Sequence, residues 1–568
     1  MTTASITLNN LSSFWTVIGL YTVLLAGVSA YFAKFIKNTD DFFVGSRHTP
    51  WWVSGLSYFM TAFSASVFVG RASFSYNYGG LSLVFILFGM PTFFFGYFIF
   101  ARKWHRTGCS TAIEFVNKRF SPATAKFFIW TGIPVRVLDN ANRLYVTAVL
   151  LEVLFGFNIW MSIIVTAAIA VLYTIAGGFL AVVLTDALQA IVMAVIVTVV
   201  AIAGFIKVGG ISGFVEQLPT SFYEMNPAGS DYSLLFIILV GFSGILSWNG
   251  YWSLVQRYVS VEKEVDARKV AMSTGISYFM LFPLLTLPPV FASILIPGLE
   301  GAETEHCFIM LSDMILPTTL FSLLCFSLFG ATITSLNSEL NVLSQIIVQD
   351  VLAKWLGKAT DKFRLFMSRF FIIVLTIFCV LMASMVRGLG GSFRYLMILL
   401  AITTIPTCGP LIMGLLYRRT PAWGAMLSFV TGITTAVLMS FVFKTSSSAM
   451  IIGNLIATFS VIFITGFIDP ATGQDEMFAR LKTPNSGDPK EQTTTARTVN
   501  IRFIKIVATC LIVLSAVLFL ASLLSSLDIS GLEILTISVL LVLGGLLLLF
   551  VYSYKSRVNN LNYEPVKE

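Results

Sequence analysis

The sequence predicts an all-α polytopic membrane protein, and three observations support this. Of the 568 residues, 57% are hydrophobic and only 11% are charged, which is unlike the composition of a soluble globular protein. The mean hydropathy is +0.86. The apolar residues form runs of about 20 or more, the length that an α-helix needs to cross a bilayer. A soluble enzyme is therefore excluded. Nucleic-acid binding is not expected either, because the basic residues behind the net charge of +8 lie mostly in short loops between apolar runs.

Fifteen hydrophobic spans are expected from the lengths of these runs. They lie at about residues 13–35, 51–73, 81–101, 123–155, 158–177, 186–206, 234–254, 268–296, 314–350, 366–387, 393–417, 422–443, 448–469, 500–523 and 533–553. Because this number is odd, the two termini are expected on opposite sides of the membrane.

The basic loops predict the orientation, since loops rich in Lys and Arg stay in the cytoplasm. Such residues gather at 102–119, 257–269, 354–364 and 418–419, and all four loops fall on one side of the predicted topology. The acidic loops at 216–231 and 300–305 fall on the other side. We therefore expect a multi-pass protein of the plasma membrane, in a bacterium the inner membrane, with its N-terminus outside and its C-terminus in the cytoplasm.

Residues 470–499 form the one sizeable polar segment, which is rich in Pro, Thr, Lys and Asp. It is expected to be a flexible cytoplasmic linker. The six cysteines have neither metal-binding nor disulfide spacing. The three histidines lie in predicted loops, so no catalytic constellation and no enzyme activity are expected.

The stretch Gly330–Asn341 is informative because it carries polar side chains inside a hydrophobic run. On a helix, Thr334, Asn337, Ser338 and Asn341 share one face. Polar groups at membrane depth usually meet a partner, a cavity or an ion, and neutral oxygens suit a hard, singly charged cation. From these residues alone two interpretations stay open: cation binding, and hydrogen bonding between packed helices.

The chain resembles the sodium:solute symporter family at five places. These are residues 41–80, with the Trp51-Trp52 pair and the small residues at 61–65; the segment YTIAGG at 173–178 with Thr185-Asp186 after it; Gln256-Arg257; the stretch 330–341; and GLLYRRT at 414–420. The resemblance covers about residues 41–420.

This resemblance implies a LeuT-type fold with two inverted repeats of five helices, at residues 51–206 and 234–417. Around them it places an extra helix and loop at 1–50, an extracellular loop at 207–233, two helices at 418–469 and two C-terminal helices with a short tail at 500–568. In such folds the first helix of each repeat is interrupted near the midplane. No Pro or Gly between Ser57 and Val69 would by itself predict that interruption.

The family's main sodium site corresponds, by its motifs, to five residues of this chain. The resemblance assigns it the carbonyl oxygens of Met60, Phe63 and Ala331 and the hydroxyls of Thr334 and Ser335. It therefore implies Na⁺ as the coupled ion.

Two further charged residues have roles that the resemblance implies. Arg47 precedes the second span and is either a positive-inside anchor or a gating and coupling residue, as in many relatives. Asp186 matches an aspartate that some relatives place in a second sodium site, which Thr334, Asn337 and Ser338 would complete here. Two sodium ions per cycle are then expected. The alternative role of Asp186 is to cap the start of the sixth span.

The substrate site is expected along the second, fourth and seventh spans. Sugar-carrying relatives have a glutamate and glutamines where this chain has Val67 and Ile86, which weakens a simple hexose assignment. Arg143 offers a planar fork to a carboxylate, as an arginine does in a sialic acid carrier, and its alternative partner is Asp139, four residues earlier. The expected substrate contacts are Ser64, Ser66, Asn140, Arg143, Asn249, Tyr251 and Trp252.

The sequence therefore predicts a sodium-coupled symporter that imports a small polar organic solute by alternating access. The solute would be a sugar, a sialic acid or a related organic anion. Its partners would be sodium, the solute and the lipid bilayer. Two alternatives stay open: a proton-coupled or sodium-independent carrier on the same fold, and a membrane sensor or scaffold.

Overall fold

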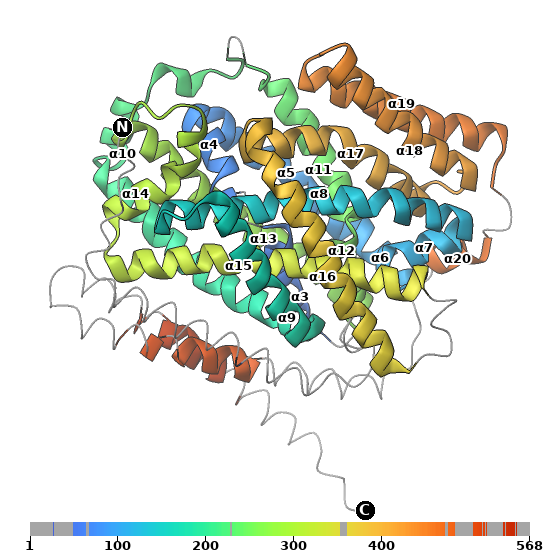
Figure 1. The fold of residues 1–568 in the computed structure, drawn as a ribbon, viewed down its shortest axis with the longest axis horizontal. Coiled ribbons are helices and arrows are strands. Elements are labelled where there is room, and N and C mark those ends of the chain that lie inside the picture. The colour runs from blue at the N-terminus through green and yellow to red at the C-terminus, as the bar shows by residue number, and fades with distance from the viewer. Residues whose placement is uncertain are drawn as a thin grey trace, which may run out of the picture.

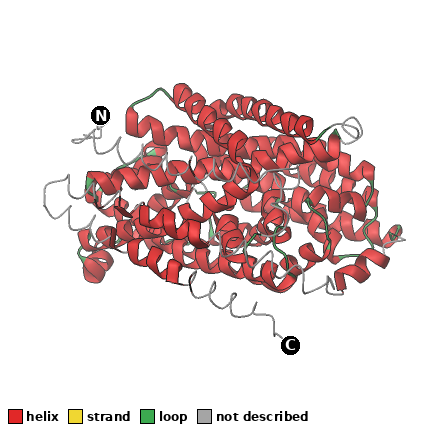
Figure 2. Cartoon of the chain, turned by 90° about the horizontal axis from the view of Figure 1, so that it is seen from below, coloured by secondary structure: helices red, strands yellow, loops and turns green. Residues whose placement is uncertain are grey.

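The computed structural model describes residues 49–63, 67–227, 230–352, 360–471, 475–482, 504–513 and 541–550, together with 27, 515–516, 519, 538–539 and 553. Most of these residues are helical, and none of them forms a strand (Figures 1 and 2). The α-helices are α3 (Trp51–Ala62), α4 (Gly70–Asn77), α5 (Gly79–Phe95), α6 (Ala101–Arg106), α7 (Ala112–Arg119), α8 (Pro122–Phe155), α9 (Ile159–Lys207), α10 (Gly210–Gln217), α11 (Leu234–Gly250), α12 (Trp252–Val259), α13 (Glu264–Leu295), α14 (Cys307–Ile315), α15 (Thr318–Ile346), α16 (Asp361–Val386), α17 (Gly391–Leu416), α18 (Ala422–Val437), α19 (Ser447–Ile468) and α20 (Asp475–Lys482). Short 3-10 or π-helical turns are η3 (Gly96–Phe100), η4 (Thr220–Tyr223), η5 (Gly301–His306), η6 (Ile347–Val351), η7 (Arg387–Leu389) and η8 (Leu438–Val442).

Eight helices of the described chain are long and apolar enough to cross a membrane, and α11 with α12 makes a ninth span that is bent by 54°. The predicted count of fifteen is therefore not confirmed; apart from Gly27, the first predicted span lies outside the described residues. The spans predicted at 158–177 and 186–206 belong to one helical run, α9, of 49 residues. No proline separates them, and the Gly177-Gly178 pair by itself does not end the helix.

Helix α15 lies at the centre of the molecule. The span Leu320–Val351, which contains all of α15 except its first two residues, is 94% buried over its most apolar stretch, whereas the span Asp361–Leu389 is 28% buried. Helices α9, α8, α3 and α16 all pack against α15. The polar stretch that the sequence singled out is thus surrounded by protein rather than by lipid.

Two spans are interrupted, as the resemblance predicts for the first helix of each repeat. Helix α3 ends before Phe63, whose backbone is extended (φ −88°, ψ 132°), and α4 resumes at Gly70. Helix α11 ends before Tyr251, which is also extended (φ −67°, ψ 131°), and α12 starts at the next residue. At Phe63 and at Tyr251 the backbone thus leaves the helical conformation.

Side chains satisfy backbone carbonyls at both interruptions. The carbonyl of Thr61, at the end of α3, accepts a hydrogen bond from Arg143 at 2.9 Å. At the end of α11, the Tyr58 hydroxyl donates to the Trp248 carbonyl, and the Trp104 indole donates to the Asn249 carbonyl at 2.7 Å. Such partners are required because there is no water in the bilayer core to satisfy the freed groups.

Three of the predicted basic loops meet on one face of the protein. Arg106 pairs with Glu264 at 2.8 Å, and Arg119 donates to carbonyls in the segment 414–420. The predicted linker contributes to this face as well, since Arg106 donates to the carbonyl of Leu481 in α20. The expectation of a wholly flexible linker is therefore wrong for residues 475–482, where buried Leu481 anchors a short helix.

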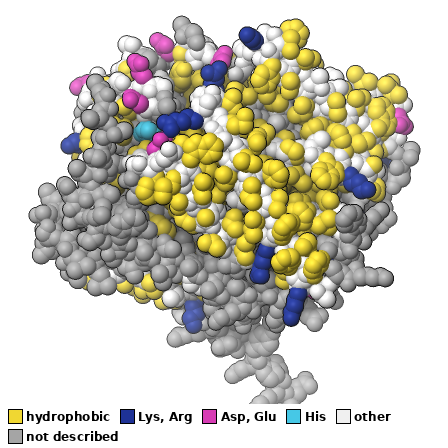
Figure 3. Space-filling view, viewed as in Figure 1, with side chains coloured by type: hydrophobic (Ala, Val, Ile, Leu, Met, Phe, Trp, Pro, Cys, Tyr) yellow, Lys and Arg dark blue, Asp and Glu magenta, His cyan; other side chains and the backbone are white. Residues whose placement is uncertain are grey.

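Many large apolar side chains of the described residues are exposed, and they cover much of the face shown in Figure 3. Phe467, Leu172 and Ile206 are each at least 70% exposed. Such a surface is stable in contact with lipid chains but not in water. The apolar exterior and the polar interior agree with a multi-pass membrane protein.

Close packing of α11 on α5 generates a stability prediction. A Cβ at Gly241 would lie 2.7 Å from the Phe88 carbonyl oxygen, whereas one at Gly244 would meet only the Thr92 hydroxyl, at 3.4 Å. Gly241→Ala is expected to lower the unfolding free energy by about 1–3 kcal/mol through overpacking. The matched control Gly244→Ala should be neutral or slightly stabilising, and thermal denaturation of both purified variants measures the difference. Equal stabilities would contradict the close approach.

Candidate functional site

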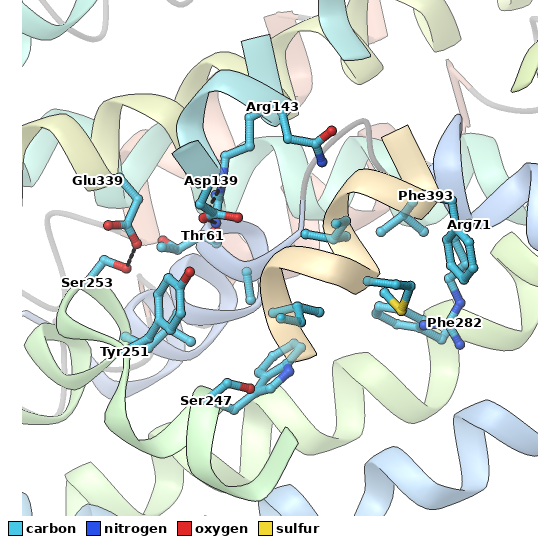
Figure 4. Close-up of a pocket in the computed structure, with 18 of the residues that line it drawn as sticks. Thr61, Arg71, Asp139, Arg143, Ser247, Tyr251, Ser253, Phe282, Glu339 and Phe393 are labelled. Atoms are coloured by element: carbon cyan, nitrogen blue, oxygen red, sulfur yellow. Dashed lines mark hydrogen bonds and ion pairs between the residues drawn. The ribbon is translucent and has the colours of Figure 1, made fainter. Parts of the chain in front are cut away.

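A cavity of about 200 Å³ lies where the two interrupted spans meet (Figure 4). Its walls come from α3, α4, α5, α8, α11, α12, α13, α15 and α17. They include four charged side chains: Arg71, Asp139, Arg143 and Glu339. Four charged groups around one interior cavity mark a functional site, because charges at membrane depth are costly.

Arg143 and Asp139 form an ion pair inside the protein. The two side chains lie one turn apart on α8, at 3.0 Å, and both are about 8–9% exposed. The same guanidinium donates to the Thr61 carbonyl at the end of α3. The fork of Arg143 is thus used within the protein, which favours the pairing role that the sequence left open over substrate contact.

Glu339 faces the cavity from α15. One of its carboxylate oxygens accepts a hydrogen bond from Ser253 on α12, and the other has no partner among the described residues. Arg136 lies behind this wall, buried, with its guanidinium 3.2 Å from the ring centre of Tyr251. The aromatic face compensates part of the cost of burying this cation.

The five residues assigned to the main sodium site are all buried, and they lie on or directly after α3 and on α15, two helices that pack against each other. They are Met60, Phe63, Ala331, Thr334 and Ser335. Phe63 is the first residue after α3, so its carbonyl lies outside the helical ladder.

The two hydroxyls of this set already donate their protons to protein oxygens. Thr334 donates to Gln189 Oε1 at 3.2 Å and to the Ala331 carbonyl at 3.1 Å, and Ser335 donates to the Thr332 carbonyl at 2.9 Å. The oxygen lone pairs therefore stay available to a cation. Neutral oxygens of this kind match the ligands that hard cations take.

Asp186 lies in a buried network with Arg257. Its carboxylate accepts from Ser57 at 2.6 Å and lies 3.7 Å from the Arg257 guanidinium, and both charged side chains are fully buried. Arg257 also donates to Ser338 at 2.9 Å and to Thr61 at 3.0 Å. Asp186 sits inside α9 and not at a helix start, so the capping role is not supported.

The prediction that Arg257 belongs to a cytoplasmic basic loop is therefore wrong. The residue is 0% exposed on α12, because the seventh span continues through its interruption to Val259. Asn337, the remaining member of the predicted second sodium site, turns toward α9, where its Oδ1 accepts from Thr174.

The predicted substrate contacts divide into three groups. Arg143 and Tyr251 line the cavity. Asn140, Asn249 and Trp252 are buried beside it but are not among its walls. Ser64 and Ser66, like the gating candidate Arg47, lie outside the described residues.

Sequence reasoning missed Arg71, which reaches the cavity from α4. The residue is the only charged one between Trp51 and Asn77, and an arginine inside an apolar span is itself a sign of function. Of the two residues compared with sugar carriers, Val67 lines the cavity, whereas Ile86 is in the core.

Two interrupted spans that enclose a charged cavity, beside a buried set of neutral oxygens, define a secondary membrane transporter of the LeuT type. The chain belongs to the sodium:solute symporter family, whose model matches residues 42–432. It is 23% identical to the Sodium/glucose cotransporter of Vibrio parahaemolyticus, over 75% of this chain and 84% of the relative. It is 25% identical to Sodium-coupled monocarboxylate transporter 2 of Mus musculus, over 76% of this chain and 72% of the relative.

Solved structures show the same fold. A Na⁺-coupled sialic acid symporter, in a substrate-bound outward-open state, superposes with a TM-score of 0.69 at 19% identity, over 81% of this chain and 98% of that one. A nucleobase-cation-symport-1 family transporter superposes with a TM-score of 0.51 at 13% identity, over 76% and 96%. The predicted LeuT-type fold and sodium-coupled symport are confirmed, and sodium is the coupled ion.

The Arg143–Asp139 pair generates the next prediction. Arg143→Ala is expected to lower the unfolding free energy by about 3 kcal/mol or more, because it leaves the buried Asp139 carboxylate without its partner. The double variant Asp139→Ala/Arg143→Ala should recover part of this loss, although the Thr61 carbonyl stays unsatisfied. Thermal denaturation in detergent measures all three proteins.

The exposed Lys118–Glu114 pair, which has the same i,i+4 spacing on α7, supplies the control. Lys118→Ala should change stability little, since exposed ion pairs contribute little. A double variant no more stable than Arg143→Ala would show that the ion pair is not the main role of Arg143.

Proposed function

We propose that this symporter imports a small organic solute through the cavity between its interrupted spans, driven by sodium bound between the end of α3 and α15. The observation that carries the proposal is the meeting of both interruptions at one charged cavity. An interrupted helix exposes backbone oxygens that can coordinate an ion next to the solute. Binding of the one can thereby alter binding of the other, as coupled transport requires.

The coupled ion is proposed to bind to the carbonyls of Met60, Phe63 and Ala331 and the hydroxyls of Thr334 and Ser335. Three observations support this site: all five residues are buried, they lie on or directly after two helices in contact, and the hydroxyl groups donate to other acceptors. A five-oxygen shell replaces most of the water that sodium loses on entry.

We propose that one sodium ion moves per solute, rather than the two expected from the sequence. Arg257 supplies the positive charge near Asp186, and its guanidinium donates to Ser338, which the second ion would need as a ligand. A sodium ion in that position would have to displace a buried, hydrogen-bonded cation, and the two like charges would repel each other.

The face that carries Arg106, Arg119 and α20 is assigned to the cytoplasm by the positive-inside rule, in the inner membrane of a bacterium, with the N-terminus outside. The two five-helix repeats are assigned to residues 51–206 and 234–417.

Uptake into proteoliposomes tests the function. Under an inward sodium gradient, purified protein should accumulate at least one compound from a panel of sugars, sialic acids, amino acids and monocarboxylates. Replacing sodium by choline should abolish accumulation, and an inward proton gradient should not restore it. Accumulation without sodium would overturn the proposed coupling.

The sodium site generates a prediction about ion dependence. Thr334→Ala and Ser335→Ala are each expected to raise the sodium concentration for half-maximal transport about tenfold or more, since a hydrogen bond or contact to a charged group contributes about 1.5–3 kcal/mol. The control Thr332→Ala removes a neighbouring hydroxyl that donates within its own helix, and it should leave sodium dependence near the wild-type value. Unchanged sodium dependence in both test variants would remove these residues from the site.

The stoichiometry generates a second prediction. The reversal potential of solute-driven sodium flux in liposomes should give a ratio of one sodium per solute. The transport that Asp186→Asn retains should show the same ratio of sodium to solute. Glu152→Gln, at the outer end of α8, serves as the control for this ratio. A wild-type ratio of two that falls to one in Asp186→Asn would place a second ion at Asp186 instead.

A further inference from the structure

We propose that Arg71 binds the anionic group of the transported solute, and that the solute is a small organic carboxylate with a compact apolar body. This inference rests on the proposed function, since it assigns a ligand to the same cavity. It concerns a residue that is not among the sodium and substrate contacts expected from the sequence.

Arg71 occupies a position from which it can contact a solute directly. It lies in the first turn of α4, immediately after the interruption of the first broken span. Its side chain lines the cavity of about 200 Å³ and also a second one of about 120 Å³, which shares Phe85, Trp248 and Phe282 with the first. In Figure 4 it lies at the opposite end of the first cavity from Glu339 and Ser253.

The guanidinium of Arg71 has unused donors. Its Nε and Nη2 atoms are buried and have no hydrogen-bond partner among the described residues, and no acidic side chain of the described chain forms an ion pair with it. The polar contact that it does make is with the Tyr278 hydroxyl. Two neighbouring donors of one guanidinium match the two oxygens of a carboxylate.

The acidic groups of the cavity do not serve as its partner. Asp139 is paired with Arg143, and Glu339 accepts from Ser253 at the far end. Among the four charged side chains that line this cavity, two are basic and two acidic, and Asp139 and Arg143 neutralise each other at close range. The end of the cavity near Arg71 therefore has positive charge that a bound anion would neutralise.

The surroundings of Arg71 specify the rest of the solute. Its guanidinium lies between two aromatic rings, 4.4 Å from the centre of Phe85 and 4.7 Å from that of Phe282. Phe74, Phe393 and Leu400 continue this apolar wall. Sugar hydroxyls placed here would lose hydrogen bonds to water without replacement, which is unfavourable, whereas an aliphatic or aromatic body would be stabilised by contact with these rings.

A thermal-shift experiment with matched ligand pairs tests the class of solute on the unmodified protein. Purified full-length protein is heated in sodium buffer with butyrate or butyramide, and with phenylacetate or phenylacetamide; each amide has the shape of its acid without the charge. At least one acid should raise the melting temperature in sodium while its amide does not. Equal shifts for acid and amide, or a response to glucose and to neither acid, would overturn the proposal.

Substitutions test the residue. Arg71→Gln should weaken binding of the responsive acid about ten- to hundredfold, as expected for loss of hydrogen bonds to a charged group. Arg71→Lys keeps the charge without the fork and should fall between Gln and wild type. The control Arg387→Gln, in which the altered arginine is exposed and pairs with Glu152, should bind as wild type does.

A separate readout distinguishes this proposal from the proposed function. Stabilisation by sodium alone, measured without any acid, should be the same in Arg71→Gln as in wild type, which also shows that the variant is folded. Absence of a sodium effect in wild type would contradict the sodium site and not Arg71. The role of Arg71 would be overturned if Arg71→Gln bound the acid as tightly as wild type does. It would also be overturned if Arg143→Lys lost acid binding while Arg71→Lys lost none.

Discussion

The interruption of two membrane-spanning helices at one place is the constraint on which the rest of the structure depends. A helix in a bilayer must satisfy its backbone hydrogen bonds internally, so each break frees groups that other parts of the protein must meet. Arg143 meets the carbonyl of Thr61, and Tyr58 and Trp104 meet carbonyls at the end of α11. Tyr58 thereby links α3 to α11, and Arg143 links α8 to α3. These contacts hold together three of the helices that form the cavity walls.

Charge pairing is the second consequence of the same environment. Each buried acid of the inner network lies next to a donor: Asp139 to Arg143, Asp186 to Arg257, and Glu339 to Ser253. By contrast, the buried Arg136 and the cavity-lining Arg71 lie against aromatic rings. Arg136 is buried behind Tyr251, whereas Arg71 lines the cavity. Of these two arginines, only Arg71 can therefore contact a ligand in the cavity.

Part of this site could be predicted from the sequence. Thr334 was singled out as a polar residue in an apolar run, and the family resemblance added Ser335; the structure buries both at the centre of the fold. Arg257 was assigned to a loop because a hydropathy profile ends a predicted span near its first charged residue. Such a profile cannot detect that the charge is buried next to Asp186 on another helix. Arg71 was passed over because its partners, Phe85, Phe282 and Tyr278, are distant in sequence.

By itself the sequence determined the class of protein, the apolar segments and the family, since composition, run length and short motifs are local properties of a chain. The resemblance implied which two spans are interrupted, but only the tertiary structure decided at which residues. No Pro or Gly marks the end of α3 at Phe63, because the break is held by contacts from α8 and α15 rather than by backbone preference. It also decided which charges are neutralised and which face the cavity, since α8, α9, α12 and α15 meet only after folding.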